Sequence, residues 1–96
     1  RIYFCGHDHF YNRALVKDSK GNPIWQVIAG TGGGKLQKWS GSYKEKNRVN
    51  CEFHNGDYHG YILVTVDGQE VKVEWKALVD TSRHKWLVLD MFKYSY

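Results

Sequence analysis

Glu70-Val71-Lys72-Val73-Glu74-Trp75-Lys76-Ala77 decides the fold class, because apolar and charged residues alternate along it without a break. Successive side chains of a β-strand point to opposite faces of its sheet. The period of two therefore predicts a strand with one buried and one solvent-exposed face. Asp67-Gly68, just before this stretch, is a typical hairpin signal, and the apolar run Tyr61 to Val66 supplies the partner strand.

The rest of the chain extends this β pattern in both directions. Residues 85–90 predict a last short strand, and the aromatic tail Phe92, Tyr94 and Tyr96 follows it. Upstream, the ranges 2–5, 14–17 and 24–29 read as strands. The last two are separated by the turn-forming residues 18–23, so they predict a hairpin.

Residues 36–58 are the least regular part of the sequence. A short helical turn is expected at 36–39, and any helix is expected to lie within 34–48. The run Gly30-Thr31-Gly32-Gly33-Gly34-Lys35 lacks the spacing of a phosphate-binding loop, since Ala29 and Leu36 occupy its required glycine and hydroxyl positions. We interpret this run as a turn.

Composition places the chain in one small globular domain, residues 1–96. Hydrophobic residues make up 42% and charged residues 25%, which is ordinary for a folded protein. Aromatic residues reach 16%, and together with the β-branched residues of the second half they favour strands. The expected fold class is mainly β, an antiparallel sheet or sandwich.

The net charge of +4 includes a basic cluster in the middle of the chain. Its residues are interleaved with Trp39 and Tyr43, a combination that some nucleic-acid-binding proteins use. Glu45 and Glu52 interrupt the cluster and no binding motif accompanies it, so we do not expect nucleic acid as a partner. The cluster consists of Lys35, Lys38, Lys44, Lys46 and Arg48.

Gly6-His7-Asp8-His9 follows the apolar residues of the first predicted strand. On an extended backbone His7 and His9 share a face, and Asp8 is turned away. Two imidazoles in this arrangement can chelate one metal ion, or give one ligand each to two neighbouring ions. A bare His-x-His pair is more often a pair of surface histidines, so the residues around it matter.

The longer stretch Tyr3-Phe4-Cys5-Gly6-His7-Asp8-His9-Phe10 resembles the last metal-binding motif, G-H-x-H, of the calcineurin-like metallophosphoesterases, which include the purple acid phosphatases. The turn at 30–33 and residues 59–96 are also similar to that family, and the resemblance implies that the aromatic tail packs over the sheet as a lid. The resemblance implies that His7 binds one metal and His9 the other, in a centre of two divalent or mixed-valence ions of zinc, iron or manganese. Asp8, Asn12 and Arg13 follow closely enough to orient a ligand histidine or a phosphate.

The same resemblance implies hydrolysis of a phosphate ester at a two-metal centre. The family's earlier motifs Gly-Asp-x-x-Asp and Gly-Asn-His-Asp/Glu do not occur in residues 1–96. A catalytic zinc ion usually has three protein ligands, whereas this chain carries two of the expected ones. We therefore expect the 96 residues to be the C-terminal part of a longer domain, inactive by themselves and with no bound metal.

Partners follow from that expectation. The chain would supply one sheet of an α/β four-layer sandwich, packed against the N-terminal part of the same domain, and the substrate would be a phosphate ester. Exposed strand edges and an apolar sheet face would favour a homo-oligomer. No apolar run is long enough to span a membrane. The family resemblance suggests a secreted or periplasmic protein, although the residues themselves do not decide the compartment.

Other readings of single residues stay open at this point. His54, Asp57 and His59 have the residue types of a second metal site, although a polar turn is the simpler interpretation. Cys5 and Cys51 could form one disulfide or be two free thiols. The alternative class of protein is a small β-sandwich interaction or carbohydrate-binding module, which would use exposed aromatic side chains at Trp39, Tyr43 and Tyr58.

Overall fold

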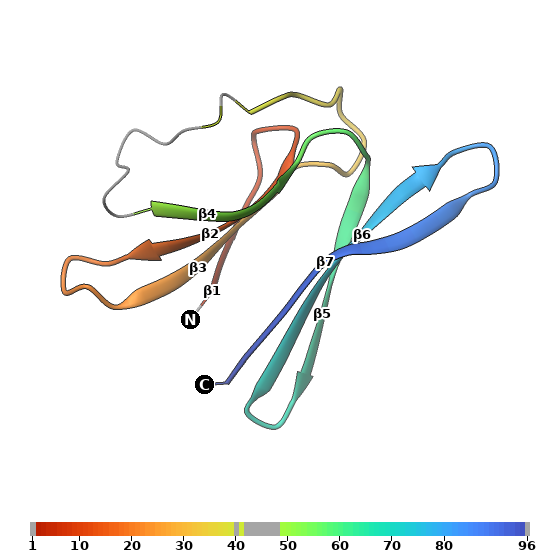
Figure 1. Ribbon diagram of the computed structural model, residues 1–96. Coiled ribbons are helices and arrows are strands. Elements are labelled where there is room, and N and C mark those ends of the chain that lie inside the picture. Colours follow the sequence, from red (N-terminus) through yellow and green to blue (C-terminus); the bar gives the residue numbers. More distant parts are fainter. Residues whose placement is uncertain (1, 40, 42–48, 96) are drawn as a thin grey trace.

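The computed structural model describes residues 2–39, 41 and 49–95, and its regular structure consists of strands (Figure 1). The fold class is therefore mainly β, as the alternation at 70–77 predicts. The strands are β1 (Ile2–Cys5), β2 (Tyr11–Lys17), β3 (Pro23–Ala29), β4 (Val49–Asn55), β5 (Gly60–Asp67), β6 (Glu70–Asp80) and β7 (Lys85–Ser95).

The first sheet has the strand order β1-β3-β2-β4. β2 and β3 form the expected hairpin, and the Asp18 carboxylate closes its turn by accepting hydrogen bonds of 2.8 Å from the backbone N–H groups of Lys20 and Asn22. β1 runs parallel to β3, with Cys5 opposite Ile28. Because of this parallel pairing, the segments that follow β1 and β3 leave the sheet at the same end.

The second sheet is an antiparallel meander, β5-β6-β7. The hairpin predicted from Asp67-Gly68 forms, with Gly68 and Gln69 as its two turn residues, and Gly68 has the positive φ of 58° that such a turn needs. The alternation of β6 is confirmed, since its apolar face is buried at Val71, Val73, Trp75 and Ala77.

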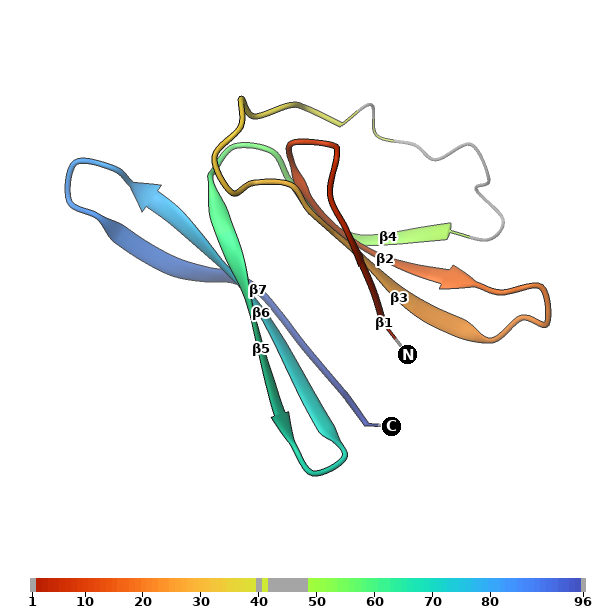
Figure 2. The same cartoon turned by 180° about the vertical axis from the view of Figure 1, so that it is seen from behind.

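The two sheets share one hydrophobic core (Figures 1 and 2). The Trp75 ring of β6 stacks on the Tyr11 ring of β2, with centroids 4.6 Å apart and planes within 4°. The Trp25 ring of β3 contacts the Phe92 ring of β7 at 4.8 Å. These contacts join the middle strands of one sheet to β6 and β7 of the other.

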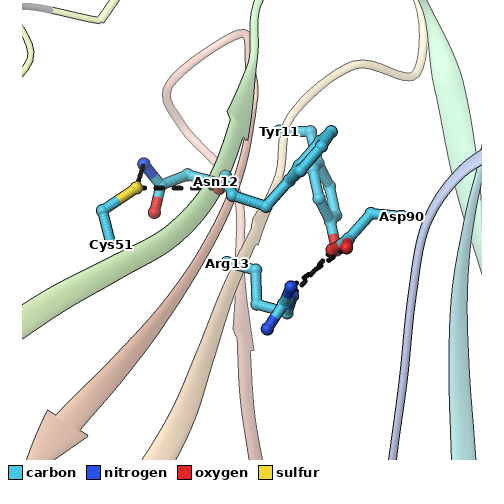
Figure 3. Close-up of polar contacts among 6 residues, drawn as sticks. Tyr11, Asn12, Arg13, Cys51 and Asp90 are labelled. Atoms are coloured by element: carbon cyan, nitrogen blue, oxygen red, sulfur yellow. Dashed lines mark hydrogen bonds and ion pairs between the residues drawn. The ribbon is translucent and has the colours of Figure 1, made fainter.

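A buried carboxylate reinforces this junction (Figure 3). Asp90 of β7 accepts a hydrogen bond of 2.7 Å from the Tyr11 hydroxyl, and bonds of 2.8 and 3.1 Å from the Arg13 guanidinium. Burial, and then the hydrogen bond and charge of Asp90, raise the pKa of Tyr11, so its phenol stays protonated. The guanidinium also lies 5.1 Å from the ring centres of Trp25 and Phe92.

Three expectations about elements are wrong. The helical turn at 36–39 is absent, because the backbone N–H and side chain of Gln37 bind the His9 backbone instead; residues 40 and 42–48 of the expected window lie outside the described part. β4 falls in the range expected to be irregular. The aromatic tail is no separate lid, since Phe92 and Tyr94 belong to β7, while Tyr96 lies outside the described residues.

Several large apolar side chains remain exposed on the outer faces of the sheets. The molecule measures 47 × 36 × 17 Å, and its shortest dimension corresponds to two packed layers. No third layer occurs in the described ranges. The described part also contains no helix that is long and apolar enough to span a membrane. The exposed apolar residues include Tyr3, Tyr61, Leu63, Trp86, Val88 and Met91.

Candidate metal-binding site

Three segments meet at one end of the first sheet, and four of the five histidines lie there. The loop after β1, the segment after β3 and the turn between β4 and β5 run side by side (Figures 1 and 2). Hydrogen bonds join them: the Gln37 N–H donates to the His9 carbonyl at 2.9 Å, and the Gly60 N–H donates to the Thr31 carbonyl at 2.9 Å. The predicted motif His7-Asp8-His9 thus belongs to a structured loop cluster.

His7 departs from the extended backbone on which its predicted direction depended. Its φ is +79°, in the left-handed region, and residues 7–10 form bends rather than a strand. The side chain is 96% exposed, and its Nδ1 lies 3.5 Å from the Asp8 carboxylate. Asp8 is therefore turned toward His7, and the strict alternation of the two histidines around it is wrong.

His9 is held firmly by the segment 34–37. Its Nδ1 lies 2.7 Å from the Lys35 carbonyl oxygen, which can only accept a hydrogen bond. Nδ1 must therefore carry the proton, and in the neutral ring the lone pair is on Nε2. The His9 backbone N–H donates to the Gln37 side-chain oxygen at 2.9 Å. This is the arrangement by which an acceptor on one ring nitrogen prepares the other nitrogen for a metal.

Glycines make room for this contact. A Cβ at Gly34 would lie 2.7–3.1 Å from three atoms of the His9 ring, and a Cβ at Gly30 would overlap the Asp8 carbonyl oxygen. The Gly34 carbonyl is 2.8 Å from His59 Nε2, so the segment is held from two sides. The sequence showed the glycine run but not its partner, because that partner depends on the parallel pairing of β1 with β3.

Asn12 and Arg13 lie on opposite faces of β2 (Figure 3). Arg13 faces the core and is engaged by Asp90, so this position adds no support for a role in orienting phosphate. Asn12 is fully buried on the other face, with its Nδ2 3.6 Å from Cys51 Sγ and 3.4 Å from His54 Nδ1.

The second histidine group has packing contacts of its own. The His54 ring lies 4.9 Å from the rings of both Phe10 and Trp39, and burial lowers the pKa of His54. His59 donates from Nε2 to the Gly34 carbonyl of the segment 34–37. Across the described residues, no three His, Cys, Asp or Glu side chains gather as a metal site, neither here nor at His7 and His9.

The two cysteines are free thiols. Cys5 lies on one edge strand of the first sheet and Cys51 on the other, with β3 and β2 between them. Three strand spacings amount to about 14 Å, whereas a disulfide needs Cα atoms within about 7 Å. Burial raises the pKa of both thiols, so neither is activated as a nucleophile.

Comparisons with protein-family models, with curated proteins and with solved structures found no match for this chain. The site is therefore defined by its own geometry. It offers one oriented imidazole at His9 and one exposed imidazole at His7. Both are donor types that suit zinc, iron or manganese, but together they fit one side of a metal centre rather than a whole one.

Proposed function

We propose that this chain is the C-terminal part of a metal-dependent phosphoesterase domain, with His7 and His9 each giving one ligand to a two-metal centre. The observation that carries the proposal is the Lys35 carbonyl on His9 Nδ1. Metal-binding histidines almost always donate their second ring N–H to such an acceptor, which fixes the ring and leaves Nε2 for the metal.

His7 complements His9 in this proposal. It sits two residues away on a left-handed turn, with its imidazole in solvent. Metals in a two-metal site lie about 3.5–4 Å apart, and neighbouring histidines of one loop can each reach one of them. Such a pair of ions, when bound, supplies Lewis-acid activation of a phosphoryl group. The remaining ligands would come from outside these 96 residues.

The outer face of the first sheet is where the N-terminal part of such a domain would pack. A groove of about 290 Å³ on this side of the molecule is lined almost entirely by apolar groups, from Ile2, Tyr3, Val16, Ile24 and Gln26. β1 pairs only with β3 among the described strands, so its outer edge is also open to a further strand. An apolar face beside an open strand edge is what a layered domain buries.

The alternative, a carbohydrate-binding or interaction module, has less support. Trp39 and Tyr58 are half-buried rather than exposed platforms, and Tyr43 lies outside the described residues. Of the basic cluster, Lys35 and Lys38 are exposed, and the other three members also lie outside the described part.

The test uses the longer protein that the proposal requires, with hydrolysis of 4-nitrophenyl phosphate as the readout. We expect turnover to be lost on chelation and restored by manganese, zinc or iron. His7→Ala and His9→Ala should each lower kcat/KM by about 100-fold or more, since each removes a metal ligand. His84→Ala, in the β6–β7 turn, is the matched control and should leave kcat/KM unchanged. Metal-independent turnover, or full turnover in His9→Ala, would overturn the proposal.

A further inference from the structure

β5 is an edge strand without the usual protection against pairing. Among the described strands it pairs only with β6, and its register with β6 is regular from Gly60–Ala77 to Asp67–Glu70. Residues 60–66 contain no charge and no proline. Exposed edges in natural proteins normally carry lysine, proline or a bulge to prevent association. The missing protection indicates that this edge is used.

Both faces of this strand are apolar and exposed. The relative exposure is 47% at Tyr61 and 40% at Leu63 on the outer face, and 41% at Val64 and 59% at Val66 on the inner face. β5 lies on the side of its sheet that is farther from β1 (Figures 1 and 2); Ile62 packs against the core, whereas Val64 and Val66 stay exposed. An extended, uncharged, apolar strand is the matching neighbour.

The hydrogen-bond pattern defines which backbone groups are open. The Leu78 N–H donates to the His59 carbonyl, so Gly60 and Ala77 form a non-hydrogen-bonded pair. The pattern alternates along the strand, and it therefore directs the N–H and C=O groups of Ile62, Val64 and Val66 to the open edge. Those of Gly60 also point there, but Thr31 binds both of them.

We propose that a second copy of this chain occupies the edge, forming an antiparallel β5–β5 pair around a two-fold axis at Val64. Val64 then lies opposite Val64 of the second copy, and Ile62 lies opposite Val66. This register uses the three open residues of each strand and leaves the Gly60–Thr31 bonds intact. The result is an isologous dimer with a continuous six-stranded sheet.

Charges on β6 favour this register over its neighbour. In the proposed register Asp67 faces Tyr61 of the second copy, whose β6 neighbour is Lys76, so opposite charges lie about 10 Å apart across two strand spacings. Likewise, Thr65, which pairs with Lys72, lies opposite Leu63 of the second copy, which pairs with Glu74. Lys72 of one copy and Glu74 of the other are therefore in line across the four strands. In the neighbouring register, Leu63 lies opposite Leu63 of the second copy. Like charges are then in line across the strands, Glu74 with Glu74 and Lys72 with Lys76. That register also needs the occupied groups of Gly60.

The interface is small, because it consists of one strand pair with its flanking side chains. Interfaces of this size belong to the weak class, below about 1,200 Å² of total buried area. We therefore expect a reversible dimer that forms with rising concentration. It does not depend on the proposed phosphoesterase function, since the β5 edge contains no residue of the metal loop.

Sedimentation equilibrium on the 96-residue chain tests the dimer. The mass should rise from 11.2 kDa toward twice that value with concentration. Val64→Lys places two like charges on the axis and should weaken association at least tenfold. Met91→Lys, at a residue of β7 with 49% exposure, is the matched control and should leave association unchanged. Val64→Pro is the second variant: it removes an N–H on the open edge and no bond to β6, and it should also give a monomer.

Cysteine cross-linking tests the register, in a background with Cys5→Ser and Cys51→Ser. Val64→Cys places two Cα atoms about 5.5 Å apart, which a disulfide can span. The two Val66→Cys positions would be about 14 Å apart, so they should not cross-link. Monomers at every concentration, or a dimer unaffected by both Val64→Lys and Val64→Pro, would overturn the proposal. Equal cross-linking at positions 64 and 66 would overturn the register.

Discussion

His9 illustrates how a single residue acquires a defined chemistry from a distant segment. Its imidazole would be one more surface group if the segment 34–37 did not reach it. The Lys35 carbonyl assigns the proton to Nδ1, and Gln37 fixes the backbone on both sides of the same residue. Gly34 is needed for space rather than for an unusual φ, because the ring fills the position of its Cβ.

Gly34→Ala should therefore disturb His9 specifically. The added methyl group would force the ring away from the Lys35 carbonyl, and overpacking of this kind costs about 1–3 kcal/mol. We expect the Nδ1–H form of His9 to lose population, measured by long-range proton–nitrogen NMR correlations of the imidazoles. Gly32→Ala is the control, since a Cβ at Gly32 meets nothing within 4 Å. Identical His9 spectra in the two variants would show that the contact does not set the tautomer.

Strands were predictable from the sequence where apolar and polar residues alternate with the two faces of the sheet. β6 alternates from Glu70 to Ala77 and pairs regularly with β5 there, so pattern and structure agree. β4 was not predictable, because the bulge opposite Arg13–Ala14 shifts its register and removes the period of two. The direction of His7 was not predictable either, since the left-handed bend follows from loop packing rather than from the motif itself.

The site is predictable only in part for the same reason. The motif identifies His7 and His9 as candidate ligands, and the glycine run marks a turn. That the turn supports His9 follows from the parallel pairing of β1 and β3, which brings two loops 26 residues apart into contact. For Arg13 the distant contact removes a predicted role, because Asp90, 77 residues away, binds its guanidinium in the core.

The Arg13–Asp90 pair joins β2 to β7, and removing one partner should weaken the connection between the sheets. The side chains are only 15% and 6% exposed, so Asp90→Asn leaves a largely buried cation without its counter-charge. We expect a loss of about 3–5 kcal/mol in the free energy of unfolding, measured by urea denaturation. Glu70→Gln is the control, because its ion pair with Lys93 is half-exposed and 3.8 Å long, and it should cost less than about 0.5 kcal/mol. Equal losses in both variants would contradict a structural role for the pair.

At the scale of the whole molecule, two sheets share one core while their outer faces retain apolar side chains. Tyr3 is 60% exposed on the outer face of the first sheet and lines its apolar groove. Met91 is 49% exposed on the outer face of the second sheet. In the proposed domain Tyr3 would be buried and Met91 would stay exposed, since the N-terminal part would cover the first face and not the second.

Tyr3→Thr therefore tests whether the outer face of the first sheet is exposed or covered. In the 96-residue chain the replaced ring is mostly in solvent, so the free energy of unfolding should change by less than about 0.5 kcal/mol. In the longer protein the same ring would be buried, and its loss should cost about 2 kcal/mol or more. Met91→Thr, measured in parallel by urea denaturation, should cost little in both. A small cost of Tyr3→Thr in the longer protein would mean that this face stays open, and the proposed packing of the domain would then be wrong.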